Sequence, residues 1–273
     1  MAPPAGLVNR TVIGRLGRMA ESGAGRPEVI FLDVGDTLIR AHPSWAGVYR
    51  QGLLEAGIDV PEKDLERALL IESQTGGWWN IEDPFEPTEE NSFRRIVDFD
   101  NAVLGRTGFT NLSEDVFRRI EEAFARRSAW YVYPDVLPSL DALREHGFRL
   151  CVISNFVWGA PELIHDLELA AHFEALVISA RVGFQKPNSG IFRHALDVMR
   201  VEPGAAMHVG DSYRADVVGA RRVGIKGVLI DRTSGADPAR IREEREDPDL
   251  VIVSDLFELL DLLGIERPAL SPA

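Results

Sequence analysis

The sequence predicts an α/β fold, a Rossmann-like parallel sheet with helices on both faces, into which a helical unit is inserted. From residue 27 onward, short apolar runs rich in β-branched residues alternate with stretches of helical periodicity, as in strands joined by crossover helices. The long interval 41–134 carries only helical patterns. The chain has 273 residues, which is enough for one large core and a smaller second unit.

Six apolar runs are predicted to form the sheet, and three helical patterns between or after them are predicted to cover its faces. The predicted strands are Val29–Leu32, Leu150–Ser154, Ala175–Ser179, Met207–Val209, Val228–Ile230 and Leu250–Val253. The helical patterns are Val136, Leu137, Leu140 and Leu143, then Ile191, Phe192, Ala195, Leu196 and Met199, and finally Leu256, Leu259, Leu260 and Leu263.

The interval 41–134 is too long for one crossover, and its patterns predict several helices and no strand. Its apolar stripes are Trp45, Val48, Tyr49 and Leu53, then Phe93, Ile96, Val97 and Leu104, and then Val116, Ile120, Ala123 and Phe124, with Ser113 as a candidate N-cap. The predicted division is an N-terminal extension (1–26), a core (27–40 and 135–264), a helical insertion (41–134) and a tail (265–273).

Composition indicates a soluble cytoplasmic protein. Apolar residues make up 45% of the chain, and no apolar run approaches the roughly 18 residues that span a bilayer, so no membrane partner is expected. The net charge of −13 opposes nucleic-acid binding. Cys151 is the single cysteine, which excludes an internal disulfide and favours a reducing compartment, and residues 1–26 lack a signal-peptide pattern.

Two predicted strands end in residues suited to phosphoryl chemistry. Asp33 follows the first strand, at the edge where parallel sheets bind ligands, and a carboxylate there can act as a nucleophile and a metal ligand. Ser154 and Asn155 follow the second strand, where a hydroxyl and a backbone N–H can hold a phosphoryl oxygen. Taken alone, both segments also fit ordinary strand-ending turns.

Two later segments add a cation and a pair of carboxylates. Lys186, one of only three lysines, precedes a predicted helix start at Pro187 with Asn188 or Ser189, where an ammonium group and a helix N-terminus suit a dianion. Asp211 and Asp216 follow another strand, and carboxylates of this kind suit Mg²⁺ better than Zn²⁺. A solvated lysine and two helix-capping aspartates are the alternative interpretations. The occurrence of all four segments at strand ends favours a phosphoryl-transfer site.

These segments resemble the haloacid dehalogenase (HAD) superfamily. The resemblance covers Val29–Thr37, Leu150–Asn155, Phe184–Phe192, His208–Ala220 and Pro248–Leu263, and the helical insertion lies where that family carries its cap. It implies that Asp33 attacks phosphorus to form an aspartyl-phosphate, and that Lys186 offsets the repulsion between Asp33 and the anion. It also implies Mg²⁺ bound by Asp33, the main-chain carbonyl of Gly35, Asp211 and Asp216, and a phosphoryl group bound by Thr37, Ser154, Asn155 and Lys186.

One position departs from the pattern of family phosphatases, which carry a second aspartate, the acid/base, where this chain has Gly35. In an extended segment Asp36 would point to the opposite face, so it is not an obvious replacement. Three functions remain open: a phosphatase of small phosphorylated metabolites, a dehalogenase-like carbon–halogen hydrolase, and a catalytically weak phosphate-binding protein. Four cap residues are candidates for a pocket wall or for core packing: Trp45, Trp78, Trp79 and Asn80. The sequence predicts no oligomeric state.

Overall fold

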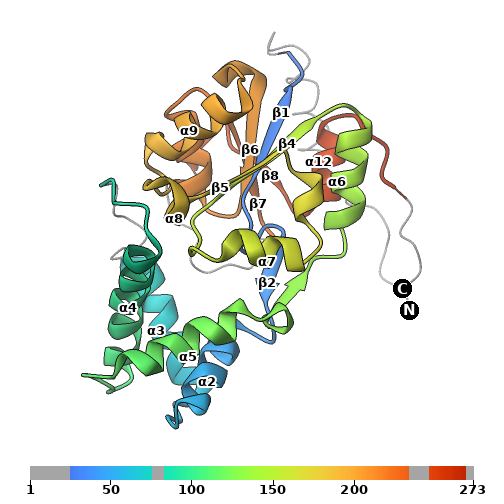
Figure 1. Cartoon of the computed structure of the whole chain (residues 1–273). Helices are drawn as coiled ribbons and strands as arrows, with labels where there is room; N and C mark the ends of the chain where they lie inside the picture. Colours follow the sequence, from blue (N-terminus) through green and yellow to red (C-terminus); the bar gives the residue numbers. More distant parts are fainter. Residues whose placement is uncertain (1–24, 76–82, 234–245, 269–273) are drawn as a thin grey trace, which may run out of the picture.

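The protein is built around a six-stranded parallel sheet with the strand order β5-β4-β1-β6-β7-β8 (Figure 1). The structure is a computed structural model that describes residues 25–75, 83–233 and 246–268. The strands are β1 (Val29–Leu32), β4 (Arg149–Ser154), β5 (Ala175–Ile178), β6 (Ala206–Gly210), β7 (Lys226–Ile230) and β8 (Val251–Val253). They confirm the six predicted runs, and the ends differ by no more than about two residues, which is the usual uncertainty of element boundaries.

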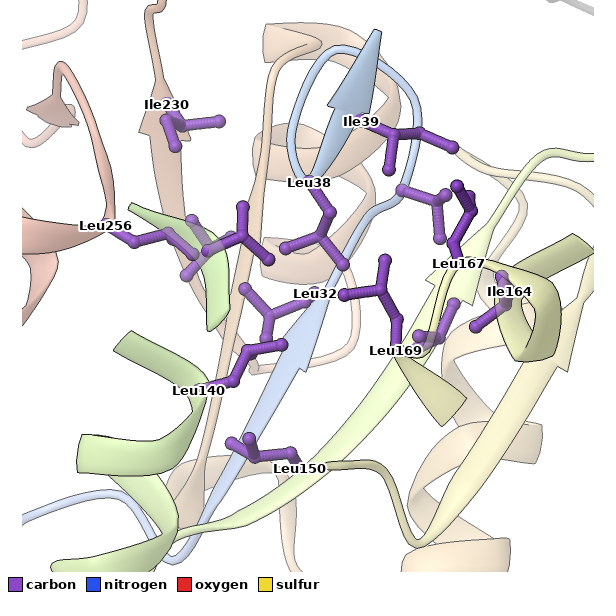
Figure 2. Packing of buried hydrophobic residues seen from close by; sticks show 14 of the residues in the cluster. Leu32, Leu38, Ile39, Leu140, Leu150, Ile164, Leu167, Leu169, Ile230 and Leu256 are labelled. Carbon is purple, nitrogen blue, oxygen red and sulfur yellow. The ribbon is translucent and has the colours of Figure 1, made fainter. Parts of the chain in front are cut away.

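Helices cover both faces of this sheet, as predicted. Successive residues of a strand point to opposite faces. Ile30 and Leu32 of β1 therefore join one apolar cluster, and Val29 and Phe31 join another. Figure 2 shows the first cluster, in which Leu32 and Leu150 lie near Leu140. The helices over this face are α6 (Val136–Glu145), α7 (Ala160–Asp166) and α12 (Leu256–Leu262), and those over the other are α9 (Ser189–Met199) and α10 (Gly219–Arg221).

Four helices in the described parts of the interval 42–129 form the cap, which lies beyond the carboxyl ends of the strands (Figure 1). They pack around an apolar cluster of their own that includes Leu53, Leu65, Leu104 and Ile120. Ser113 occupies the N-cap position of the last helix, as predicted, although its side chain makes no capping hydrogen bond. The cap helices are α2 (Trp45–Glu55), α3 (Glu62–Thr75), α4 (Glu89–Arg106) and α5 (Glu114–Ala125).

A short antiparallel ribbon joins the cap to the core, and it corrects the prediction that residues 41–134 contain no strand. β2 (Ile39–Ala41) leaves the core and pairs with β3 (Trp130–Val132), which returns to it. Each strand has three residues, which is too short for an alternating pattern to be read. Hydrogen bonding between β2 and β3 therefore forms a ribbon that the hydrophobic periodicity of the sequence does not predict.

Several short helical segments complete the described chain. They are η1 (Arg127–Ala129), η2 (Ala170–His172), α8 (Ser179–Val182), η3 (Pro203–Ala205) and the π-helical turn η4 (Tyr213–Val218). The predicted pocket residues Trp78, Trp79 and Asn80 lie outside the described residues, as do positions 1–24 and 269–273. Among the described helices, none is both long enough and apolar enough to cross a membrane.

Asp100 is a buried carboxylic acid inside the cap. Its side chain is 1% exposed, and its Oδ2 lacks a hydrogen-bond partner within the part of the chain that the structure describes. Burial raises the pKa of Asp100 well above its usual range, and the negative charge of Glu121 raises it further. The folded protein therefore binds this proton more tightly than the unfolded chain does. Stability should fall as pH rises from the unfolded pKa of about 3.9 toward the folded value.

Asp100→Asn should remove this component of the pH dependence, because asparagine does not ionise. Between pH 4.5 and pH 8, the Tm of the variant is expected to fall less than the Tm of the wild type. Each 1 kcal/mol in the free energy of unfolding corresponds to about 2–4 °C in Tm. Asp98→Asn, on the exposed side of the same helix, is the control and should behave like the wild type. Parallel pH profiles for all three proteins would contradict the assignment.

Candidate active site

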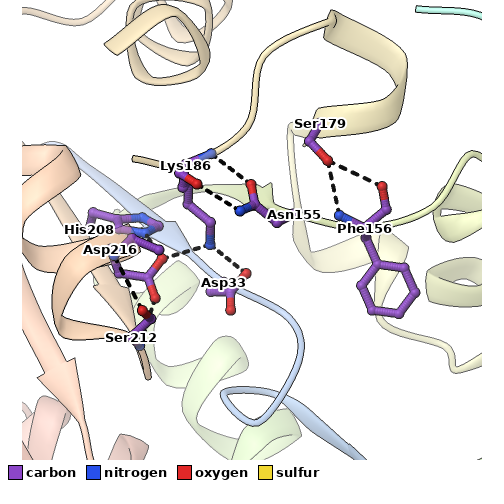
Figure 3. A network of polar contacts seen from close by, with 9 residues as sticks. Asp33, Asn155, Phe156, Ser179, Lys186, His208, Ser212 and Asp216 are labelled. Atoms are coloured by element: carbon purple, nitrogen blue, oxygen red, sulfur yellow. Dashed lines mark hydrogen bonds and ion pairs between the residues drawn. The ribbon is translucent and has the colours of Figure 1, made fainter. Parts of the chain in front are cut away.

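The four predicted segments meet at the carboxyl edge of the sheet (Figure 3). β4 and β6 flank β1, so the residues that follow these strands are neighbours. The Asp33 amide donates to the carbonyl of Val209 at 2.9 Å, which continues the β1–β6 ladder to the predicted nucleophile. Asp33 is 7% exposed at this edge. The sheet order therefore brings together side chains that are far apart in the sequence.

The segment after Asp33 is a tight turn, and this corrects the assumption that it is extended. The amides of residues 37–39 all donate to the carbonyl of Val34. Asp36 has a φ of 49°, in the left-handed region that aspartate tolerates better than most residues. Its Oδ2 accepts a hydrogen bond of 3.2 Å from Nε1 of Trp45 in the cap. The premise that Asp36 lies in an extended segment is therefore wrong, and the alternation of side chains in a strand gives no reason to set Asp36 aside.

Burial raises the pKa of Asp36, and the negative charge of Asp33 raises it further against the lowering effect of the Trp45 hydrogen bond. Asp36 is therefore close enough to Asp33 for the charges of the two carboxylates to interact. The exposed indole of Trp45 accordingly lies at the boundary between cap and core.

Lys186 is the central cation of the site. Its side chain is 2% exposed, and its Nζ lies 2.7 Å from Oδ1 of Asp33 and 2.6 Å from Oδ1 of Asp216. Burial alone would lower the pKa of Lys186, but the two carboxylates outweigh burial and raise it. The ammonium group therefore stays charged and joins the segments that follow β1 and β6.

Asn155 holds the backbone of Lys186. Its Nδ2 donates to the Lys186 carbonyl at 2.9 Å, and its Oδ1 accepts from the Lys186 amide at 2.7 Å. Both ends of the amide are thus engaged with the lysine backbone. This contact was not predicted, because it joins residues 31 positions apart. It gives Asn155 a positioning contact in addition to the phosphoryl-binding role predicted for it.

Asp33, Asp211 and Asp216 form an acidic cluster in which one oxygen of each residue lies within 4.8 Å of the others. Asp211 is solvent-exposed at its surface, yet its pKa is raised well above its usual range, because the surrounding protein atoms displace part of its water and because Asp33 and Asp216 are negative. Burial would raise the pKa of Asp216 too, but Lys186 and His208 lower it. A set of carboxylate oxygens with mutual repulsion fits a hard divalent cation.

His208 is a site residue that the sequence reasoning missed. It is fully buried in β6, and its Nε2 lies 2.8 Å from Oδ1 of Asp216. The amide of Ser212 donates to the other oxygen of Asp216 at 2.9 Å. The available signal was a histidine within an apolar strand, because a buried polar side chain requires a partner. Asp216 is therefore held by three groups around its carboxylate.

The remaining predicted residues are also placed at this edge. Ser154 is 1% exposed at the end of β4, and Gly35 is partly buried in the turn. Thr37 is fully buried, and its Oγ1 has no hydrogen-bond partner among the described residues. The Thr37 hydroxyl is therefore buried, and its contact with a phosphoryl group stays a prediction.

Gly210 permits the close approach of Asp216. A Cβ atom at position 210 would lie 2.2 Å from Cγ of Asp216, which is far inside van der Waals contact. Gly210→Ala should displace this carboxylate from Lys186 and His208, and a misplacement of about 1 Å can cost about 10²-fold in rate. Hydrolysis rates measured on folded Gly210→Ala test this. Gly204→Ala, where a Cβ meets nothing within 4 Å, is the control. Equal activity of the two variants would contradict the argument.

The sheet, the Asp33 carboxylate, the buried lysine and the acidic cluster define an α/β protein with a candidate site for hydrolysis at the carboxyl edge of the sheet. The sequence model for haloacid dehalogenase-like hydrolases matches residues 27–224. The chain belongs to this family of hydrolases, as its motifs predicted.

Relatives of known name support the same family. Over 238 residues, the chain is 34% identical to haloacid dehalogenase-like hydrolase domain-containing protein 3 of Mus musculus. The alignment covers 86% of this chain and 94% of that protein. Over 147 residues, it is 37% identical to the phosphoserine phosphatase of Thermus thermophilus, covering 52% of this chain and 55% of that protein. The family therefore includes phosphatase relatives of this chain.

The crystal structure of the HAD-hydrolase YfnB from Bacillus subtilis, bound to magnesium, matches with a TM-score of 0.70. The match covers 88% of this chain and 100% of that chain at 17% identity. At this identity the likeness shows the shared fold: a Rossmann-like core and a helical cap.

Proposed function

We propose that this protein is a magnesium-dependent phosphatase that hydrolyses a small phosphorylated metabolite through an aspartyl-phosphate on Asp33. The single observation that carries the proposal is the junction of Lys186 with the acidic cluster. A buried ammonium touches both Asp33 and Asp216, and Asp211 lies beside them. This arrangement offers an anion site and a cation site on the two sides of one nucleophile, as phosphoryl transfer requires.

Each side chain has a distinct role in this proposal. Asp33 attacks phosphorus, the bond from phosphorus to the leaving-group oxygen breaks, and an aspartyl-phosphate forms. Water then hydrolyses this acyl phosphate, which releases inorganic phosphate and restores the Asp33 carboxylate. Lys186 binds a phosphoryl oxygen and offsets the charge of the incoming dianion, while Asn155 fixes its backbone. Ser154 and Thr37 contribute hydroxyl groups to the phosphoryl site.

The metal site in this proposal consists of Asp33, the Gly35 carbonyl, Asp211 and Asp216. The donor set fits Mg²⁺, which prefers oxygen ligands. Bound there, Mg²⁺ would supply the positive charge that lets a phosphate dianion approach three carboxylates.

A screen of purified protein against phosphorylated metabolites, with and without magnesium, tests this function. Phosphate release should disappear in excess chelator and return when Mg²⁺ is restored in excess. Zn²⁺ should restore less, because it prefers nitrogen and sulfur ligands. Full activity in excess chelator would refute the metal assignment, and no phosphate release from any compound would refute the phosphatase.

Gly35 favours a second candidate, a dehalogenase-like carbon–halogen hydrolase. Halide departure needs no proton donor, so the acid that is missing at this position would not be required. The acidic cluster argues against this reaction, which has no need of a divalent cation. Halide release from 2-haloacids in the presence of chelator would support the dehalogenase. Phosphate binding without turnover of either substrate class would support a phosphate-binding protein.

A further inference from the structure

Arg232 lies just beyond the carboxyl end of β7 and outside the family motifs. Its side chain contacts several segments around the candidate site. Its side chain is only 10% exposed. Nε and Nη2 donate to the carbonyl oxygen of Thr37 at 2.9 and 2.6 Å. Nη1 and Nη2 donate to the two carboxylate oxygens of Asp135 at 3.0 and 3.1 Å. The guanidinium group thus donates hydrogen bonds at the same time to the Thr37 carbonyl, in the turn after Asp33, and to the buried Asp135 carboxylate.

The partners of Arg232 are themselves anchored. Asp135, at the start of α6, also accepts a 2.7 Å hydrogen bond from the amide of Leu256 at the start of α12. The guanidinium carbon lies 3.8 Å from the ring centre of Tyr133, whose amide donates to the carbonyl of Leu38 at 3.1 Å. Tyr133 directly follows the ribbon strand β3. Arg232 therefore joins the turn to two core helices and to the chain that returns from the cap.

The position of the Thr37 carbonyl matters because of the turn geometry. The amides of residues 37–39 all converge on the Val34 carbonyl, so the turn is a single unit that begins next to Asp33. A planar guanidinium with five donors can hold a carbonyl and a carboxylate in fixed relative positions, which an ammonium group cannot do. Fixing one end of this turn limits the motion of the nucleophile at the other end.

We propose that Arg232 is a positioning residue that holds the turn after Asp33, and through it Asp33 itself, in its reactive geometry. The proposal rests on the proposed phosphatase function for its kinetic consequence. Its structural consequence, a turn whose order depends on Arg232, is independent of that function.

The test compares Arg232→Met and Arg232→Lys with Arg149→Met, a control of similar chemistry at the opposite edge of the sheet. Arg149 pairs with Glu174 through two nitrogen atoms, and its Nη1 donates to the carbonyl of Met199. Its side chain is 33% exposed. The measurements are kcat and KM for an aryl phosphate with saturating Mg²⁺, Tm, and hydrogen exchange of the amides of residues 37–39.

Arg232→Met should lower kcat by about 10²-fold with little change in KM, because a misplaced nucleophile slows the chemical step more than it weakens binding. The amides of residues 37–39 should exchange faster. Arg232→Lys should recover part of kcat, and Arg149→Met should change Tm without either effect.

Two results would overturn the proposal. One is a kcat of Arg232→Met equal to that of Arg149→Met, which would make Arg232 a stabilising residue only. The other is unchanged exchange of residues 37–39 in folded Arg232→Met, or in Arg232→Lys if the methionine variant does not fold. If the wild type releases phosphate from no compound, the phosphatase proposal fails, while the exchange comparison still decides whether Arg232 orders the turn.

Discussion

Asp33→Asn is expected to lower turnover by about 10⁴-fold or more while the protein stays folded, because losses of this size follow removal of a nucleophile. Asparagine has nearly the same shape, and its Oδ1 can still accept the hydrogen bond that Lys186 donates to Asp33. What is lost is the oxygen nucleophile and one negative charge of the acidic cluster. The measurement is kcat of the purified variant with saturating Mg²⁺, and thermal unfolding shows that it is folded.

The matched control for this substitution is Asp255→Asn. Asp255 caps α12 by accepting from the amide of Glu258 at 2.7 Å, and asparagine is an equally good N-cap. This variant should retain wild-type turnover. Substantial turnover by Asp33→Asn, in protein free of wild-type contamination, would mean that another residue is the nucleophile.

Gly35→Asp is expected to speed hydrolysis of alkyl phosphates by up to about 10²- to 10⁴-fold, which is the range of general acid–base catalysis. Without an acid at this position, the leaving group must depart as an anion, so wild-type rates should fall steeply from aryl and acyl phosphates to sugar and alkyl phosphates. The structure accommodates the substitution. The φ of Gly35 lies outside the left-handed region, and a Cβ there would meet nothing within 4 Å.

The experiment is a leaving-group series on the wild type, Gly35→Asp and Gly35→Asn. Asparagine has the size of aspartate but cannot transfer a proton, so it separates acid catalysis from any steric or polar effect. The slope against leaving-group basicity should flatten only in Gly35→Asp. A flat wild-type series, with the chemical step shown to limit the rate, would mean that another group donates the proton, and Asp36 would be the first candidate.

The sheet could be predicted from the sequence because its central strands β1, β4 and β6 are buried on both faces. Such strands need continuous apolar runs, and all six are visible as runs of this kind. The functional edge could also be predicted, since residues that follow neighbouring parallel strands must converge there. Asp33, Lys186 and Asp216 accordingly meet in the structure.

What could not be predicted depends on contacts that leave no periodic trace. The left-handed φ of Asp36 arises from a local turn, and an aspartate does not by itself specify that backbone conformation. The pairing of His208 with Asp216 depends on how the π-helical turn η4 folds back over the end of β6. The ribbon strand β3 is too short to show an alternation. The last two features are set by tertiary packing rather than by local propensity.

The ribbon of β2 and β3 has a consequence for the engineering of this fold. Ala41 and Trp130 are direct partners in the ladder, and the His42 amide donates to the Ala129 carbonyl at 2.8 Å. The 88 residues from 42 to 129 therefore enter and leave through neighbouring points, as an inserted domain does. We expect that this segment can be exchanged, or replaced by a tight hairpin turn, without a change in the strand order of the sheet. Grafting another helical unit between Ala41 and Trp130 would then change access to the candidate active site, while the six-stranded core that holds the site residues is kept.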